Sequence, residues 1–351
     1  MKKTLLLIAI TILFSNVYSQ NLHHKLTVEL LPDNGLITVI DTIYLQKSFC
    51  EGNKVFYFEL NKELKIKPLS DKFSLTKVTA TEDNSYATKY KIEYSDVAKS
   101  DLIIPVFYEG FIKDEQEKQS IEYARSFTET KGKISPEGIY LSGSSFWVPH
   151  FNNQELLSFT LNVKIDSAWS IVSQGTRTIN EINSNKKNIR YESPEPMDEI
   201  YLTAAKWTEY SIMADNILVQ AFLRTPDEEL ANKYLGVTSH YIRLYESLIG
   251  KYPFTKFALV ENFWQSGYGM PSFTLLGDKI IRFPWILHSS YPHELLHNYW
   301  GNSVYVDYEN GNWCEGITAY MADHLIKEQQ GKGADYRMTT LKKFTDYVNP
   351  D

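Results

Sequence analysis

Two histidines four positions apart, in the segment HELLHNYW at residues 293–300, most constrain what this chain can fold into. On an α-helix His293 and His297 lie on one face, one turn apart, and Glu294 is one position round from the first. This spacing lets two imidazoles bind one metal ion while a carboxylate is held beside it. Pro292, directly before the motif, suits the first turn of a helix. The same segment also fits two half-buried polar residues on an aromatic helix face.

A second segment, WCEG at residues 313–316, supplies a third metal ligand. Glu315 follows His297 after seventeen residues, enough for a loop and a return past the first helix. Its own predicted helix runs to about Gln330. Two histidines and a glutamate from a neighbouring helix form a zinc site whose fourth position stays open. Glu315 alone could instead be a helix N-terminal carboxylate stabilised by the helix dipole, but the two motifs in this order favour the metal site.

The predicted site holds one Zn²⁺ per chain, bound by His293, His297 and Glu315. Glu294 would act as a general base and then as a general acid. Metal-bound histidines are usually held through their other ring nitrogen by a hydrogen bond. The sequence offers three side chains for this purpose and does not choose among them: Asn298, Asp307 and Asp323.

Residues 20–210 are predicted to form a β-rich domain. Short runs of β-branched and aromatic residues, several of them alternating, indicate strands. These runs are NKVFYFELN, ATKYKIEYS, DLIIPVFYEGF, LLSFTLNVKI and EIYLTAAKW. Turn residues separate them, for example PDNG at 32–35. The pattern is typical of an all-β sandwich or a saddle-shaped assembly of sheets.

The pattern changes after about residue 210, and residues 211–351 are predicted to form a mixed α/β domain. A strand-like run, NILVQAFLR at 216–224, precedes a long helical pattern at 227–249. A further strand, FALVEN at 257–262, is followed by a glycine-rich edge, SGYGMPSF at 266–273. The metal motif comes next.

The N-terminus and the composition bear on where the protein acts. Lys2 and Lys3 precede an apolar run at residues 5–14 and a small residue, Ser19, which predicts a signal peptide over residues 1–19 and export to the periplasm or the medium. An uncleaved membrane anchor is the alternative, although the run is too short to span a bilayer. The net charge of −7 disfavours a nucleic-acid partner.

The cysteine count leaves two alternatives open. Cys50 and Cys314 are the two cysteines of the chain, and they could form one disulfide bond in an oxidising compartment. Two separate buried thiols are the favoured interpretation, because Cys314 lies beside the metal motif.

The segment HELLHNYWGNSVYVDYENGNWCEGITAY resembles the gluzincin core of the membrane alanyl aminopeptidase family, to which leukotriene hydrolase-like enzymes belong. In that family HExxH is followed by Trp-Phe-Gly-Asn and later by Trp-Leu-Asn-Glu-Gly, where this chain has NYWGN and WCEG. GKYPFTKFALVEN at 250–262 and SFWVPHFNNQELLSFTLNV at 145–163 are also similar to the family. The resemblance covers roughly residues 145–325. It implies a saddle-like β domain packed on a thermolysin-like zincin domain, zinc on His293, His297 and Glu315, and a peptide or protein substrate.

The substrate-binding edge departs from the family pattern. The family signature Gly-x-Met-Glu-Asn supplies a carboxylate that holds the free amine of the substrate. This chain keeps a candidate edge strand, formed by Gly267, Tyr268, Gly269 and Met270, but has Pro271-Ser272 in place of Glu-Asn. Glu261 could replace the carboxylate only if the fold brought it to this edge.

Two further departures concern spacing and length. The family usually places eighteen residues between the second histidine and the glutamate ligand, against seventeen here, so a shifted helix register is one possible result. The family's transition-state tyrosine lies on a later helical region, and neither Tyr336 nor Tyr347 matches it. The segment ends 36 residues after Glu315, so we expect a catalytic domain truncated after the zinc-site helices.

Three functions fit these observations. The preferred one is a zinc metallopeptidase that is aminopeptidase-like but lacks the glutamate that recognises a free amine. The competing one is a non-catalytic relative of the same fold that binds peptides or proteins. A third is an endopeptidase or small-molecule hydrolase that accepts N-blocked substrates.

Overall fold

A computed structural model describes residues 22–78, 86–113, 117–118, 128–151, 156–307, 309 and 311–348. The predicted signal peptide, residues 1–19, lies outside the described residues. Within these ranges we find no helix with both the length and the apolar character needed to cross a lipid bilayer.

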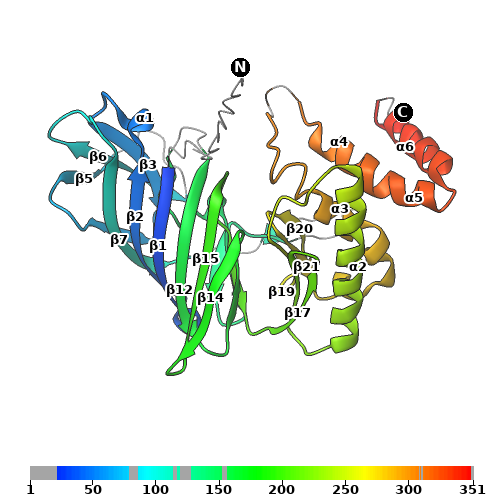
Figure 1. Cartoon of the computed structure of the whole chain (residues 1–351). Helices are drawn as coiled ribbons and strands as arrows, with labels where there is room; N and C mark the ends of the chain where they lie inside the picture. The colour runs from blue at the N-terminus through cyan, green and yellow to red at the C-terminus, as the bar shows by residue number, and fades with distance from the viewer. Residues whose placement is uncertain are drawn as a thin grey trace, which may run out of the picture.

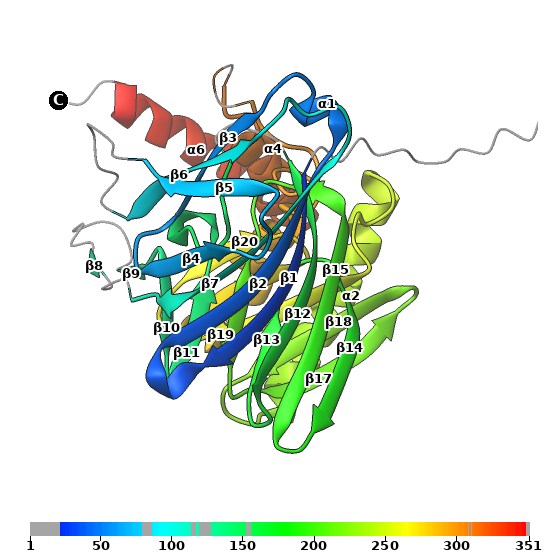
Figure 2. The same ribbon diagram turned by 90° about the vertical axis from the view of Figure 1, so that its left-hand side faces the viewer.

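A seven-stranded sheet dominates the first half of the chain (Figure 2). Its strands, in spatial order, are β14 (Thr176–Asn183), β15 (Lys186–Met197), β12 (Leu157–Asp166), β1 (Leu22–Leu31), β2 (Leu36–Leu45), β7 (Leu102–Phe111) and β4 (Leu64–Pro68). The β1–β12 pair is parallel and the other pairs are antiparallel. Alternate residues of β1 are buried, as expected for a sheet with one face on a core.

Smaller sheets complete the β-rich region. One contains β3 (Val55–Asn61), β6 (Ala87–Tyr94) and β5 (Phe73–Lys77). Another contains β10 (Gly132–Ser135), β11 (Gly138–Leu141), β16 (Leu202–Ala205) and β13 (Ser170–Val172). A two-stranded ribbon joins β8 (Glu117–Lys118) to β9 (Thr128–Glu129), and the short helix α1 spans Lys47–Cys50. One apolar core unites these sheets around the fully buried Trp147, whose Nε1 donates to the Ile200 carbonyl at 2.9 Å.

A five-stranded mixed sheet begins the second half of the chain (Figure 1). Its spatial order is β17 (Thr208–Ala214), β18 (Ile217–Leu223), β19 (Lys256–Asn262), β21 (Phe273–Gly277) and β20 (Gly267–Met270). The three inner strands are parallel, and β17 and β20 are antiparallel edges. Helix α2 (Glu228–Leu248) connects β18 to β19 and starts at Asp227, whose carboxylate accepts from the Leu230 N–H at 2.9 Å.

Shorter helices follow the mixed sheet. In chain order they are η3 (Ile280–Arg282), η4 (Pro284–His288), α3 (Ser290–Leu296), α4 (Cys314–Ala319), a π-helical turn η5 (Tyr320–His324), α5 (Leu325–Gln329) and α6 (Gly333–Val348). The predicted helix from Glu315 to about Gln330 is thus two α-helical pieces joined by a π-turn. Buried residues of α2 and α3 share a second apolar core with the mixed sheet.

The predicted fold class is confirmed: a strand-rich first region precedes a mixed α/β region that carries the metal motif. The boundary expected at residue 210 falls within β17, which pairs with the mixed sheet, and it stays a prediction. Cys50 and Cys314 are both buried free thiols, in agreement with the favoured interpretation.

Candidate metal centre

Helix α3 presents the two histidines of the HELLH motif. Tyr291, Leu295 and Leu296 are fully buried in the second core, so the opposite side of α3 is directed away from that core. His293 lies on this side, and His297 caps the helix. Their side chains are only 17% and 14% exposed, and their Nε2 atoms are 3.2 Å apart. The spacing of four residues therefore places both imidazoles at one point.

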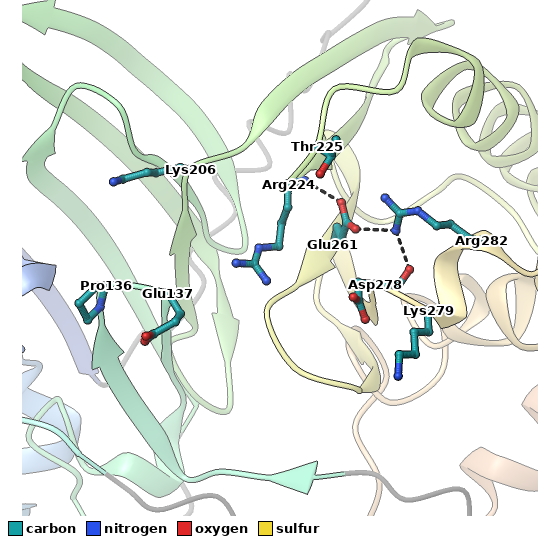
Figure 3. A pocket seen from close by; sticks show the side chains of 9 residues that line it. All are labelled: Pro136, Glu137, Lys206, Arg224, Thr225, Glu261, Asp278, Lys279 and Arg282. Atoms are coloured by element: carbon teal, nitrogen blue, oxygen red, sulfur yellow. Dashed lines mark hydrogen bonds and ion pairs between the residues drawn. The ribbon is translucent and has the colours of Figure 1, made fainter.

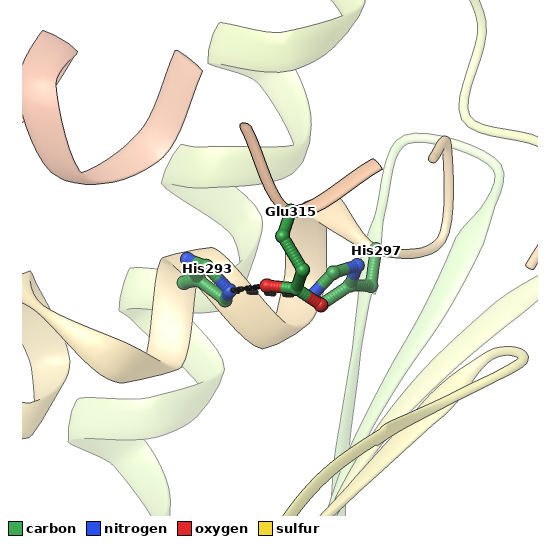
Figure 4. A group of neighbouring side chains, drawn as sticks. All are labelled: His293, His297 and Glu315. Atoms are coloured by element: carbon green, nitrogen blue, oxygen red, sulfur yellow. Dashed lines mark hydrogen bonds and ion pairs between the residues drawn. The ribbon is translucent and has the colours of Figure 1, made fainter. Parts of the chain in front are cut away.

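Glu315, at the start of α4, meets both histidines (Figure 4). Its Oε2 lies 3.4 Å from His293 Nε2, and its Oε1 lies 3.5 Å from His297 Nε2. These three residues form a group that could hold a metal ion. Ligands about 2.0–2.1 Å from a tetrahedral zinc ion are about 3.3 Å from one another, close to the separations observed. Glu315 is 62% exposed, so the site is open to solvent.

The other nitrogen of each imidazole is held by an acceptor. Asp323 Oδ2 lies 3.1 Å from His293 Nδ1, and the Trp300 carbonyl lies 3.1 Å from His297 Nδ1. Ionised carboxylate and carbonyl oxygens only accept, so each Nδ1 carries a proton, and in the neutral imidazole each Nε2 then presents a lone pair. Two lone pairs and a carboxylate facing one another repel unless a cation or a proton lies between them. The donor set therefore fits Zn²⁺.

Of the three candidates, Asp323 is the one seen in contact with a histidine of the motif, and the hydrogen bonds of the other two are to different groups. Asn298 is fully buried and accepts from the Ser272 N–H at 2.6 Å and from the Tyr252 hydroxyl at 3.0 Å. Asp307 accepts from the Glu309 N–H at 3.3 Å. The Trp300 carbonyl could not be predicted from the sequence, because every residue has a backbone oxygen and the residue type does not mark it as an acceptor for His297.

Glu294 is a half-buried residue of α3 whose side chain lies against Gly269 of the edge strand β20. A Cβ atom at Gly269 would lie 2.8 Å from Glu294 Oε2 and 3.0 Å from the Glu294 carbonyl. Burial raises the pKa of Glu294 to about 7, and the carboxylates of Glu315 and Asp323 act in the same direction. A carboxyl group that titrates near neutral pH is well suited to accept and return a proton.

Strand β20 contains the four predicted substrate-binding residues. Gly267, Tyr268 and Gly269 are half-buried at the edge of the mixed sheet, whereas Met270 is buried in a third apolar cluster. The Asn302 side chain donates to the Gly269 carbonyl at 3.4 Å. An exposed strand edge can take up an extended peptide as an additional strand.

The Pro271-Ser272 turn replaces the expected carboxylate with a buried anchor. Ser272 is fully buried with a φ of +66°, and its N–H donates to Asn298 at the end of the metal-binding helix. The Lys256 ammonium donates to the Ser272 hydroxyl at 2.8 Å and to its carbonyl at 3.2 Å. The turn between β20 and β21 is therefore tied to α3 and offers no anion to a substrate amine.

Glu261 does not supply the missing carboxylate. It is 2% exposed on β19, separated from β20 by β21, and accepts from Arg282 Nη1 and from the Arg224 N–H, each at 2.6 Å. It lines a cavity of about 470 Å³ between the β-rich region and the mixed sheet (Figure 3). The residues lining this cavity are Pro136, Glu137, Lys206, Arg224, Thr225, Glu261, Asp278, Lys279 and Arg282.

The two downstream tyrosines lie on α6. Tyr347 is 84% exposed near the end of this helix. The ring of Tyr336 lies 5.9 Å from the ring of His324. The contact between Tyr336 and His324 involves none of the three candidate metal ligands.

No family model and no curated protein sequence matches this chain. Among solved structures, an M1 zinc metallopeptidase from Deinococcus radiodurans superposes with a TM-score of 0.67 at 14% identity, over 93% of this chain and 74% of that one. Yeast LTA4 hydrolase superposes with a TM-score of 0.66 at 16% identity, over 93% of this chain and 51% of that one. The chain has the fold of the M1 zinc metallopeptidases. At such low identity the likeness concerns the fold alone.

Proposed function

We propose that this protein is a zinc-dependent peptidase. The observation that carries the proposal is the convergence of His293, His297 and Glu315 at one point, with Glu294 held between that point and an edge strand. The M1 metallopeptidase fold supports the same reaction class. We expect the substrate to be a peptide or a protein.

Each group has a defined role in the proposed reaction. A zinc ion bound by the three ligands would activate water and polarise the carbonyl of the scissile bond. Glu294 takes a proton from the attacking water and returns it to the leaving amine. Strand β20 holds the substrate in an extended conformation beside Glu294. Asp323 and the Trp300 carbonyl keep both imidazoles in the tautomer that presents Nε2.

The proposed specificity follows from the Pro271-Ser272 turn. Because this turn offers no carboxylate and Glu261 is paired elsewhere, a free N-terminal amine gains little binding energy at this edge. We therefore expect N-acetylated peptides to be cleaved at rates within about tenfold of those for their free-amine counterparts. Acetylation removes the charge of the amine, but this edge offers no carboxylate with which that charge could pair. We also propose export, which rests on the apolar run at residues 5–14.

The test replaces Glu294 with glutamine. Glu294→Gln removes proton transfer and keeps the shape of the side chain, so turnover of fluorogenic peptides should fall by about 10²–10⁴-fold. Zinc content, measured by elemental analysis, should stay at one ion per chain. Glu181→Gln, at an exposed position of β14, is the matched control and should leave turnover unchanged. Full activity in the Glu294→Gln protein would refute the proposal.

The competing function is a peptide-binding protein of the same fold without catalysis. The lack of an amine-holding carboxylate is the observation that favours it. Such a protein would bind peptides with equal affinity in the wild-type and Glu294→Gln forms and would release no product from either.

A further inference from the structure

The helix that carries Glu315 is not uniformly wound. It runs as α4 (Cys314–Ala319), the π-turn η5 (Tyr320–His324) and α5 (Leu325–Gln329). Two carboxylates of this segment contact the same imidazole from opposite sides. Glu315 Oε2 lies 3.4 Å from His293 Nε2, and Asp323 Oδ2 lies 3.1 Å from His293 Nδ1. Glu315 precedes the π-turn, and Asp323 lies within it.

A regular α-helix would not direct both carboxylates to His293. Successive residues of an α-helix are rotated by about 100°. A residue seven positions after Glu315 would lie about 20° from it around the axis, and a residue eight positions after it about 80° away. Asp323 is eight positions after Glu315. A π-turn closes its hydrogen bonds from i to i+5 and so contains one residue more than an α-helical turn. Because of this extra residue, Asp323 lies on the same side of the helix as the seventh residue after Glu315 would in a regular α-helix.

The packing of this segment shows the same extra residue independently. One buried row recurs at every fourth position, with exposures of 4%, 0%, 0% and 5% for Cys314, Thr318, Ala322 and Ile326. His324, which is 7% exposed, lies off this row and contacts Arg337 and Tyr336 of α6. In a regular α-helix, steps of four drift by about 40° each, or about 120° over the row. The π-turn absorbs this drift, so the row stays directed at the interior.

We propose that the π-turn at Tyr320–His324 makes Asp323 a positioning residue of the metal centre. In a regular α-helix, the residue on the same side as Asp323 and seven positions before it would be Gly316, which has no side-chain ligand atom. The extra residue returns Glu315 to that place. One helix then supplies both a ligand and the carboxylate that fixes the His293 tautomer. This inference rests on the proposed function, because it assigns the purpose of the contact to metal binding.

The first test removes the positioning carboxylate. Asp323→Asn should weaken zinc binding by about 10–100-fold in a chelator competition, the usual effect of losing such a partner. Glu328→Gln is the matched control, because Glu328 lies on the same segment but contacts His324 and Arg337. It should leave the zinc affinity unchanged. Equal zinc affinities for wild type and Asp323→Asn would overturn the inference.

The second test uses the opposite effects of shortening and lengthening the turn. Deletion of Tyr320, which is 63% exposed, should convert the π-turn to an α-turn and leave Glu315 and Asp323 in place. Zinc affinity should then stay within about threefold of wild type. One alanine inserted between Ala319 and Tyr320 should rotate Asp323 by about 100° and weaken zinc binding at least as much as Asp323→Asn. In a uniform α-helix both changes would misplace Asp323, so equal losses in folded proteins would overturn the inference.

A readout without metal separates this inference from the proposed function. In zinc-free protein, at a pH high enough for the imidazoles to be neutral, long-range ¹H–¹⁵N spectra should show His293 fixed with its proton on Nδ1. This tautomer should persist after deletion of Tyr320 and be lost in Asp323→Asn and in the insertion variant. If the wild type bound no zinc while His293 kept this pattern, the proposed function would fail and the positioning role would stand. If His293 sampled both tautomers in the wild type, the positioning role would fail.

Discussion

Gly269 is the residue at which the edge strand β20 lies against helix α3, which carries the HELLH motif. A Cβ at this position would lie 3.0 Å from the Glu294 carbonyl and 3.3 Å from His297 Cβ. A backbone oxygen and a helix Cβ cannot move aside as a flexible side chain can. Glycine is therefore needed here for close approach and not for a special φ.

Gly269→Ala should separate catalysis from metal binding. The added methyl group would displace Glu294 or β20, and a shift of about 1 Å in a reacting group lowers turnover on the order of 100-fold. Zinc content should stay at one ion per chain, because none of the three ligands is replaced. Gly236→Ala on helix α2, where a Cβ meets no atom within 4 Å, is the control and should leave turnover unchanged. Unaltered turnover in Gly269→Ala would mean that β20 does not set the position of Glu294.

At the scale of elements, the strand β19 and the β20–β21 turn are joined through the buried side chain of Lys256. Lys256 is 2% exposed and donates to Ser272. Its Nζ also lies 5.5 Å from the centre of the Phe273 ring. Burial lowers the pKa of Lys256 from 10.5 to about 7, and the positive charge of Arg177 acts in the same direction.

Lys256 should make the stability of the protein depend on pH in the alkaline range. Between about pH 7 and 10.5 the unfolded chain binds the lysine proton and the folded chain does not, so the free energy of unfolding rises with pH. The slope is at most about 1.4 kcal/mol per pH unit for one group. Urea unfolding at pH 7 and pH 9 should show this rise in the wild type and a smaller one in Lys256→Met. The same pH slope in both proteins would show that Lys256 keeps its proton when folded.

At the scale of the whole molecule, the β-rich region and the mixed sheet are packed together. One apolar cluster contains Tyr140 and Val172 from the first region and Phe222 and Val260 from the second. A bidentate ion pair crosses the same junction, with Arg177 of β14 donating to Glu209 of β17 at 2.9 and 2.5 Å. The loop after α3 also reaches the first region, where the Tyr305 hydroxyl donates to the Pro196 carbonyl at 3.2 Å.

Arg177→Ala should weaken this junction. The side chains of Arg177 and Glu209 are only 13% and 24% exposed, so removal of the guanidinium leaves a partly buried carboxylate without its cation. We expect a loss of about 2 kcal/mol in the free energy of unfolding, below the value for a fully buried pair. Arg243→Ala, which breaks an ion pair whose partners are 58% and 67% exposed, should cost less than about 0.5 kcal/mol. Similar losses for both variants would show that the junction gains nothing from Arg177.

The sequence alone was sufficient for the order of the two regions, the long helix near residues 227–249 and the motif that brings His293, His297 and Glu315 together. These features depend on local periodicity and on residue types at fixed spacing, and both are visible within a short segment of sequence. The tertiary structure decided that Asp323 contacts His293 whereas Asn298 has other partners, that Glu261 pairs with Arg282, and that Ser272 is a buried anchor. The first outcome depends on the π-turn η5 in the helical segment after Glu315, and the second on the position of β21 between β19 and β20. No single segment contains that information, because it arises only when distant segments pack against one another.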